Sequence, residues 1–194
     1  IQYIPRMTMY TDGGKEVYYG AKNEPRNGVL FGLCVDSQTR SELEDESLIL
    51  TYQEICQPLT YYNRDALSDA LMNHDAIEFA LNCPHESVCI SNIHSLEGNL
   101  QEISDLFKMY PEVKIFLRFA AEFDVWSDMA EPEAYKEAFR YVSNFFKNRN
   151  PNVALVWSPN QVSGYYVDAD EFYPGDQYVD WVGLSLYSVP YFIG

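Results

Sequence analysis

Basic residues and long apolar runs are both scarce in this sequence. It has 13 Lys and Arg residues against 29 Asp and Glu residues, which gives a formal net charge of −16. Because nucleic-acid binding draws its affinity from clustered basic side chains, this balance predicts no nucleic-acid partner, whereas a neutral polymer such as a polysaccharide is compatible with it. No run of about 18 apolar residues occurs, so the sequence also predicts no membrane span.

Cysteine and histidine are few, and their spacing fits no standard metal site. The chain has 4 Cys and 3 His residues. One group, Cys83, His85, Cys89 and His94, departs from the usual zinc-ligand spacings, so we expect no metal ion and no other cofactor. A disulfide between Cys83 and Cys89 and a pair of buried thiols are both left open, because the spacings match no disulfide framework.

A dinucleotide-binding fingerprint is missing as well. The first expected strand runs into Phe31-Gly-Leu-Cys-Val-Asp-Ser37, which lacks the glycines that a bound pyrophosphate requires. Apolar runs that suit strands nevertheless alternate with helical patterns at about 30 residues per unit, which indicates repeated βαβ crossovers and a parallel sheet. We therefore predict an α/β fold, a (β/α)8 TIM barrel, with a doubly wound sheet as the alternative topology.

The expected elements set the domain boundaries. Residues 1–28, rich in Tyr, Gly and charge, are expected to be a lead-in segment or the tail of a preceding domain, and residues 29–194 a partial barrel. Expected strands cover residues 29–35, 59–62, 76–81, 113–120, 153–157 and 178–187, and expected helices cover residues 41–56, 63–74, 100–110 and 132–149. A complete barrel needs about 250 residues, so the sequence predicts roughly the first six βα units.

The expected functional residues centre on the fourth strand and the residues that follow it, Val113-Lys-Ile-Phe-Leu-Arg-Phe-Ala-Ala-Glu-Phe-Asp-Val-Trp126. Its alternation puts the apolar residues at positions 113, 115, 117 and 119 on one face, suited to packing on helices, and Arg118 and Glu122 on the other. In a barrel that second face points along the axis, and Glu122 lies at the carboxyl end, where barrel enzymes keep their catalytic groups. A helix cap or a solvated loop residue is the alternative for Glu122. Because a guanidinium within an apolar strand is costly unless carboxylates meet it, we expect an acidic partner for Arg118.

Further polar and aromatic residues follow the expected strands at the same edge. Asp124 and Trp126 come after the fourth strand, Trp157-Ser-Pro-Asn160 follows the fifth, and Tyr187 ends the sixth. Trp157 is expected to line a cleft, where its face can stack on a sugar ring, and a core position is the alternative. The turn Tyr173-Pro-Gly-Asp176 suits a type II turn and is expected to be structural.

Three segments carry a family resemblance in combination. They are Phe116-Leu-Arg-Phe-Ala-Ala-Glu122, Val153-Ala-Leu-Val-Trp-Ser-Pro-Asn160 and Phe172-Tyr-Pro-Gly-Asp-Gln-Tyr-Val-Asp-Trp-Val-Gly-Leu-Ser-Leu-Tyr187. Together they resemble glycoside hydrolase family 26, the β-mannanase family of clan A. The resemblance implies a secreted or cell-surface (β/α)8 enzyme that cleaves β-linked polysaccharide, β-mannan or a related β-glycan, with retention of configuration.

The resemblance also implies roles for single residues. Glu122 matches the acid/base after the fourth strand, and a nucleophilic Glu after a seventh strand is expected beyond Gly194. A retaining pair needs two carboxyl groups about 5 to 5.5 Å apart, with the pKa of the acid raised. Tyr187 matches the tyrosine that orients the nucleophile.

The expected sugar-binding set contains Trp126, Trp157 and Asn160 from the resemblance. Arg118 and Asp124 are added to it because they lie on the same face or at the same edge.

The sequence departs from the family pattern immediately around Glu122. Ala121 stands where His is usual, and Phe123-Asp-Val125 stands where Met-Asn-Gly or a similar segment is usual. A second hypothesis is therefore a carbohydrate-binding or cell-surface module that kept the barrel and lost catalysis. The chain starts at Ile1 without a basic-then-apolar leader, so we expect that any signal peptide has been removed or is left out of this sequence. The oligomeric state is left open.

Overall fold

The structure, a computed structural model, describes residues 18–26, 29–33, 48–55, 57, 59–83, 86–125, 130–164 and 167–186. The strands in this part are β1 (Gly32–Leu33), β2 (Leu48–Glu54), β3 (Ala76–Asn82), β4 (Lys114–Phe119), β5 (Val153–Trp157) and β6 (Trp181–Val182). The helices are α1 (Tyr61–Asn73), α2 (Glu86–Ser91), α3 (Glu97–Lys108) and α4 (Pro132–Arg149), with short 3-10 turns η2 (Ile93–Leu96) and η3 (Ala169–Phe172).

The strands form one sheet in which the spatial order equals the chain order. Every neighbouring pair, from β1 with β2 to β5 with β6, is parallel. A doubly wound sheet reverses its strand order at a switch point, so the unbroken order excludes that alternative and is the order found in a (β/α)8 barrel. The predicted α/β fold, with part of a TIM barrel, is confirmed.

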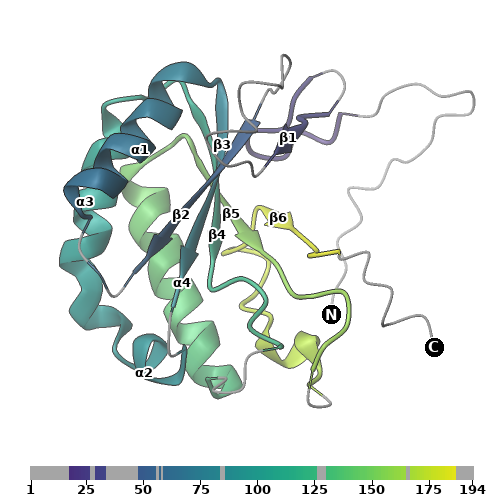
Figure 1. Cartoon of the computed structure of the whole chain (residues 1–194). Coiled ribbons are helices and arrows are strands. Elements are labelled where there is room, and N and C mark those ends of the chain that lie inside the picture. Colours follow the sequence, from purple (N-terminus) through teal and green to yellow (C-terminus); the bar gives the residue numbers. More distant parts are fainter. Residues whose placement is uncertain are drawn as a thin grey trace, which may run out of the picture.

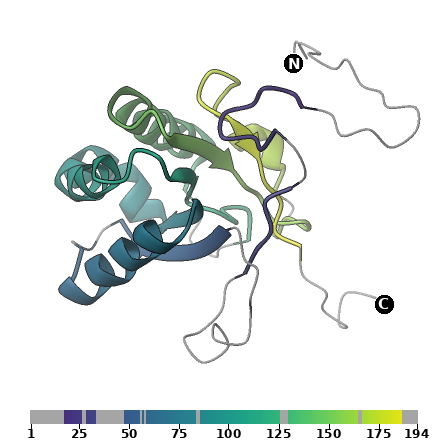
Figure 2. The same ribbon diagram turned by 90° about the horizontal axis from the view of Figure 1, so that it is seen from above.

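Helices α1, α3 and α4 all lie along one face of the sheet (Figure 1), and the view from above shows the same one-sided cover (Figure 2). The alternation in β4 explains this arrangement. Ile115, Leu117 and Phe119 are fully buried on the helix-covered face, whereas Phe116 and Arg118 are only half-buried on the other face. We call this second face, which carries Arg118, the inner face. The predicted parity of β4 is therefore correct.

Helix α4 has the bounds that the sequence predicts. Pro132 occupies its first turn, where a missing backbone N–H costs nothing, and Lys147 and Arg149 lie in its last turn, at the negative end of the helix dipole. The stripe that packs on the sheet and on neighbouring helices is apolar and aromatic apart from Ser143. Its buried members are Tyr135, Ala138, Phe139, Val142, Ser143, Phe145 and Phe146.

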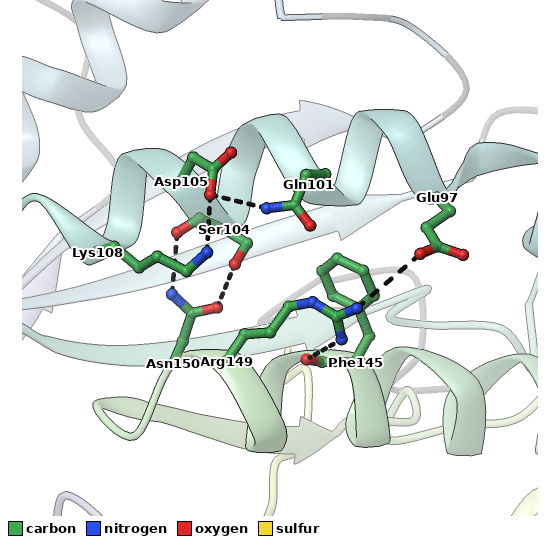
Figure 3. A network of polar contacts seen from close by, with 8 residues as sticks. All are labelled: Glu97, Gln101, Ser104, Asp105, Lys108, Phe145, Arg149 and Asn150. Atoms are coloured by element: carbon green, nitrogen blue, oxygen red, sulfur yellow. Dashed lines mark hydrogen bonds and ion pairs between the residues drawn. The ribbon is translucent and has the colours of Figure 1, made fainter.

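Helices α3 and α4 are also joined by a polar network (Figure 3). Ser104 and Asn150 are fully buried, and Ser104 Oγ donates to Asn150 Oδ1 over 2.7 Å while Asn150 Nδ2 donates to the Ser104 carbonyl over 3.0 Å. At the surface of the same interface, Arg149 lies 3.9 Å from Glu97 and 4.0 Å from the centroid of the Phe145 ring. Because the buried pair satisfies itself, the interface can contain polar groups without an unsatisfied donor at this point.

Two predicted elements in the first third of the chain are wrong. Residues 48–54, expected to be helical, form β2, and the strand expected at residues 59–62 is replaced by the start of α1 at Tyr61. The spacing of Leu48, Tyr52 and Ile55 fits a helix, but a short apolar run fits a buried parallel strand equally well. The N-cap of α1 is Thr60, since Thr60 Oγ1 accepts from the Asn63 N–H over 3.1 Å.

The sixth strand is shorter than expected. Residues 178–187 were predicted to be extended throughout, but β6 contains only Trp181 and Val182, and a parallel bridge between Asn160 and Ser185 continues the pairing. The side chains of Val182, Leu184 and Leu186 are 65%, 55% and 69% exposed, whereas Leu117 and Leu155 in the inner strands are fully buried. These three alternating apolar side chains, in β6 and directly after it, are thus not covered by any other described part of the chain.

The described part of the expected lead-in segment packs against the amino ends of the strands. Asn23 Nδ2 donates to the carbonyls of Ile115 and Asn152 over 3.1 and 2.8 Å, and Trp181 Nε1 donates to the Lys22 carbonyl over 2.7 Å. Lys22 and Asn23 of the expected lead-in segment therefore bind the sheet directly, while the predicted domain boundary stays a prediction. Among the described helices, none has the length and apolar content needed to cross a bilayer.

Candidate active site

The loop after β4 holds Glu122 in an unusual backbone conformation. Ala120 has φ +45° and Glu122 has φ +61°, in the left-handed region that non-glycine residues rarely adopt. The N–H of Ala120 donates to the Leu81 carbonyl over 2.9 Å, and the N–H of Glu122 donates to the Ser158 carbonyl over 2.9 Å. Strain of this kind persists only where neighbouring segments impose it, and it concentrates at functional sites.

Arg118 lies on the inner face, and the acidic partner expected for it is Glu78 of β3. Arg118 Nη1 lies 3.0 Å from Glu78 Oε1, and the two side chains are 18% and 30% exposed. Arg118 Nη2 donates to Ser158 Oγ over 3.1 Å and to Ser185 Oγ over 3.0 Å. One guanidinium therefore connects β3 and β4 with the segments that continue β5 and β6.

A glycine allows β6 to approach this group closely. A Cβ on Gly183 would lie 3.0 Å from Val156 Cγ1, 3.1 Å from Ser158 Oγ and 3.2 Å from Ser158 Cβ. The Gly183 N–H donates to the Trp157 carbonyl over 2.8 Å, which fixes the approach. Ser185 reaches Arg118 because no side chain at position 183 pushes the segment away.

Asp124 is fully buried, and its carboxylate is bound to the loop after β5. Oδ1 accepts from the Asn160 N–H over 2.9 Å, and Oδ2 accepts from the Ser163 hydroxyl over 2.7 Å. Its carbonyl accepts from the Gly164 N–H over 2.8 Å. The expected contact between Asp124 and a sugar stays a prediction. In this conformation the Asp124 carboxylate is buried and has no exposed surface that a sugar could reach.

Trp157 lies on the helix-covered side of the sheet, which differs from the expected cleft position. Its ring is 6% exposed and packs at 5.6 Å from the Phe123 ring and 5.2 Å from the Tyr173 ring, measured between centroids. In the sheet register Val156 is paired with Arg118 and Trp181, so Val156 shares the inner face and Trp157 points away from it. Stacking of Trp157 on a sugar stays a prediction that would need its ring to move.

The cluster around Trp157 also contains the Tyr173-Pro-Gly-Asp176 turn. Gly175 has φ +110°, as a type II turn requires, and Tyr173 Oη donates to Asp176 Oδ1 over 2.9 Å. Burial, together with this bond to a carboxylate, raises the pKa of Tyr173 to about 12. The structure assigns these residues to packing, in line with the structural turn that the sequence predicts.

Asn160 and two further predicted residues complete the expected set. Asn160 lies at the carboxyl edge, where its bridge to Ser185 and its bond to Asp124 hold its backbone. Trp126 and Tyr187 lie outside the described residues, so their expected roles stay predictions. Glu122, Arg118 and Asn160 are thus linked through shared contacts with Ser158, Ser185 or Asp124.

Three contributors to this site were not predicted from the sequence. Glu78, Ser158 and Ser185 all bind Arg118. Glu78 was detectable, since it is the only charged residue in the apolar run Ala76-Ile-Glu-Phe-Ala-Leu81. The two serines carry no signal of their own, because a hydroxyl at a strand end is common at any loop.

The cysteine and histidine group does not form a metal centre among the described residues, in which no cluster of three or more potential ligands occurs. Cys83 and Cys89 are both buried and are not joined in a disulfide, and a hydrogen bond with Cys83 lowers the pKa of Cys89. His94 instead packs edge-on against Tyr141, with ring centroids 4.3 Å apart and an angle of 67° between the ring planes. His85 lies outside the described residues.

The model of glycosyl hydrolase family 26 matches residues 73–192, more than half of the chain. This chain belongs to glycosyl hydrolase family 26. The match includes β3 to β6 and therefore Glu78, Arg118 and Glu122. A search of curated proteins found no match.

Solved structures of family 26 proteins share the fold of this chain. An endo-β-1,4-mannanase double mutant from Cellulomonas fimi has a TM-score of 0.59 at 15% identity, covering 81% of this chain and 46% of that one. A family 26 β-mannanase from Bacteroides ovatus has a TM-score of 0.54 at 15% identity, covering 71% and 51%. A family 26 protein from a Muricauda species has a TM-score of 0.54 at 17% identity, covering 72% and 50%. The family 26 chain described here spans about half the length of these structures.

Proposed function

We propose that the protein containing this chain is a glycoside hydrolase that cleaves β-mannan or a related β-glycan by a retaining double displacement, with Glu122 as the general acid/base. The observation that carries the proposal is the backbone of Glu122, held left-handed at the carboxyl end of β4 by a bond to Ser158. Barrel enzymes place their reacting groups at this end of the strands. Two similar solved structures are described as mannanases, which supports the substrate class.

In the proposed mechanism Glu122 first donates a proton to the glycosidic oxygen and later takes one from water. The second carboxylate attacks the sugar carbon, and we place it after a seventh strand beyond Gly194, about 5 to 5.5 Å from Glu122 as retention requires. Tyr187 would orient this nucleophile. Arg118 would keep the inner face polar, because its guanidinium and the hydroxyls of Ser158 and Ser185 form one connected group.

The test is Glu122→Gln in a protein that contains this chain and a complete barrel. The amide keeps the size of the side chain but is too weak an acid to transfer a proton, so release of reducing ends from mannan should fall by about 100-fold or more while oligosaccharide affinity is kept. Glu112→Gln, an exposed position before β4, is the matched control and should retain full activity. Hydrolysis by Glu122→Gln within a few-fold of the parent would refute the assignment.

A binding module without catalysis is the second candidate, and the residues beside Glu122 favour it. Phe123 is buried against Tyr135, with ring centroids 4.5 Å apart, and Asp124 is bound to the neighbouring loop. Neither side chain therefore adds an exposed polar group next to the carboxyl group. Calorimetric binding of mannan, mixed-linkage glucan or xylan fragments without any release of reducing ends would select this alternative.

We also propose that the protein acts outside the cell or at its surface. The support is the substrate class, because an intact polysaccharide does not enter a cell. Fractionation of the producing cells is the test. Recovery of the protein from the cytoplasm alone would contradict extracellular action.

A further inference from the structure

Two loops at the carboxyl edge of the sheet are joined by one buried carboxylate. Asp124 belongs to the loop after β4, and it is fully buried. It accepts two hydrogen bonds from the loop after β5, one from the Asn160 N–H over 2.9 Å and one from the Ser163 hydroxyl over 2.7 Å. Both carboxylate oxygens are therefore engaged by donors that are 36 and 39 residues away in the chain.

Backbone contacts bring the same two loops together on either side of this carboxylate. The Gly164 N–H donates to the Asp124 carbonyl over 2.8 Å, and the Glu122 N–H donates to the Ser158 carbonyl over 2.9 Å. A Cβ on Gly164 would lie only 3.4 Å from the Asp124 carbonyl oxygen. The loops therefore lie in van der Waals contact, and the Asp124 side chain lies within their shared surface.

A buried carboxylate is costly unless hydrogen bonds compensate it, so the two donors must stay in place for Asp124 to stay buried. Left-handed backbone at Ala120 and Glu122 is a second cost in the same loop. The hydrogen bonds that compensate both costs exist only while the two loops are joined. Release of the second loop would remove the Ser158 carbonyl that holds the Glu122 N–H.

We propose that Asp124 is a positioning residue, whose carboxylate fastens residues 158–164 to residues 120–125 and thereby fixes Glu122 for proton transfer. This inference rests on the proposed function of Glu122. Asp124 acts by holding the loop whose Ser158 carbonyl accepts from the Glu122 N–H, and this role needs no contact between Asp124 and the sugar. Loss of its carboxylate should therefore affect the proton-transfer step in particular, because a small displacement of a catalytic group can cost about 100-fold in rate.

The experiment compares Asp124→Ala, Glu122→Gln and the double variant on two substrates, in a protein with a complete barrel. Mannan has a poor leaving group that needs the proton, whereas an aryl glycoside with an acidic phenol as leaving group needs little protonation. We expect Asp124→Ala to lose about 10- to 100-fold in kcat/KM on mannan and less than about 5-fold on the aryl substrate. The double variant should be no slower on mannan than Glu122→Gln alone, because both changes remove the same step.

Equal losses on both substrates, or full additivity in the double variant, would overturn the inference and leave the role of Glu122 standing. Conversely, an active Glu122→Gln variant would refute the proposed function itself. Asp105→Ala, on the exposed side of α3, is the control and should behave as the parent on both substrates.

A second measurement, hydrogen exchange, tests the attachment of the two loops without enzyme turnover. It uses a milder variant, so the inference can be tested even if Asp124→Ala does not fold. Ser163→Ala removes one donor to Asp124 and keeps the carboxylate, so it should be better tolerated. Hydrogen exchange of the Glu122 and Gly164 amides should become about 10-fold faster in this variant, while exchange within α4 stays unchanged. Unchanged exchange at both amides would overturn the inference.

Discussion

The two ends of the parallel sheet are held largely by different side chains, although a Lys147–Asp180 ion pair at 3.2 Å lies just before β6. At the amino end, neutral carboxamides donate to main-chain carbonyls: Asn23 to Ile115 and Asn152, and Asn152 to Tyr110 and Val113. The carboxyl end instead depends on charged side chains. There Arg118 binds a carboxylate and two hydroxyls, and the carboxylate of Asp124 binds an amide and a hydroxyl.

The two ends of the sheet also differ in which residue types adopt left-handed backbone. At the amino end the left-handed position is taken by Asn23, φ +64°, a residue type that tolerates this conformation. At the carboxyl end it is taken by Ala120 and Glu122, which do not. Barrel proteins keep stability at the bottom of the strands and chemistry at the top, and in this chain the left-handed alanine and glutamate lie at the top.

The largest expected effect is at Asn150, near the amino end. Asn150→Ala removes both hydrogen bonds to Ser104 and leaves a buried hydroxyl and a buried carbonyl without that partner. We expect the free energy of unfolding to fall by about 2–3 kcal/mol, measured as a shift of the urea midpoint at constant m. The Ser104→Ala, Asn150→Ala double variant should lose less than the sum of the single losses. A loss below about 0.5 kcal/mol would show that the buried pair adds nothing.

The next effect concerns the charged group at the carboxyl end. Arg118→Leu leaves Glu78 without its cation, but Glu78 is 30% exposed, so we expect a loss of about 1–3 kcal/mol, less than for a fully buried pair. Adding Glu78→Gln should restore part of this loss, since the uncompensated charge disappears. If Glu78→Gln made the Arg118→Leu variant weaker, the two ends would not differ in the way described.

A smaller effect should reveal the strain beside Glu122. Ala120→Gly loses a buried methyl group and gains chain entropy in the unfolded state, but it relieves a left-handed alanine, so these contributions offset and stability should change by less than about 0.5 kcal/mol. Ala138→Gly in α4 is the control, because it loses a buried methyl in regular helix, and it should cost about 1–2 kcal/mol. Equal losses at the two positions would mean that Ala120 stores no strain.

The smallest effect is a pH dependence at Tyr173. Its pKa is raised to about 12 in the folded protein, and an unfolded tyrosine has a pKa near 10. Below about pH 10 both states keep the proton and the contribution is complete; above it the unfolded state ionises first, so stability falls as the pH rises towards 12. Urea midpoints between pH 9 and about pH 11 should fall less steeply for Tyr173→Phe than for the parent. Identical slopes would exclude Tyr173 as the cause.

Prediction from sequence succeeded where a segment had several turns of one helical spacing or an uninterrupted apolar run between two turns. Helix α4 and strand β5 were placed at their observed bounds, since one has five turns of consistent spacing and the other is a continuous apolar run between two turns. The pattern failed for β2 and the start of α1, where a short run of apolar residues fits both periods. Strand β5, with 5 residues, is shorter than β2, with 7, so the uninterrupted apolar run of β5 between two turns, and not its length, made the difference.

The sequence by itself determined the parity of β4, and with it the inward position of Arg118 and the need for a carboxylate partner. Alternation along one strand is a local property, so it can be taken from consecutive residues. Only the tertiary structure decided that the partner is Glu78, 40 residues away, and that Asp124 faces the next loop. The tertiary structure also decided that Trp157 faces the helices. Strand β5 is apolar at every position, so its sequence does not show which residues point to which face of the sheet. These outcomes depend on the register between strands, which is fixed by contacts among segments distant in the chain.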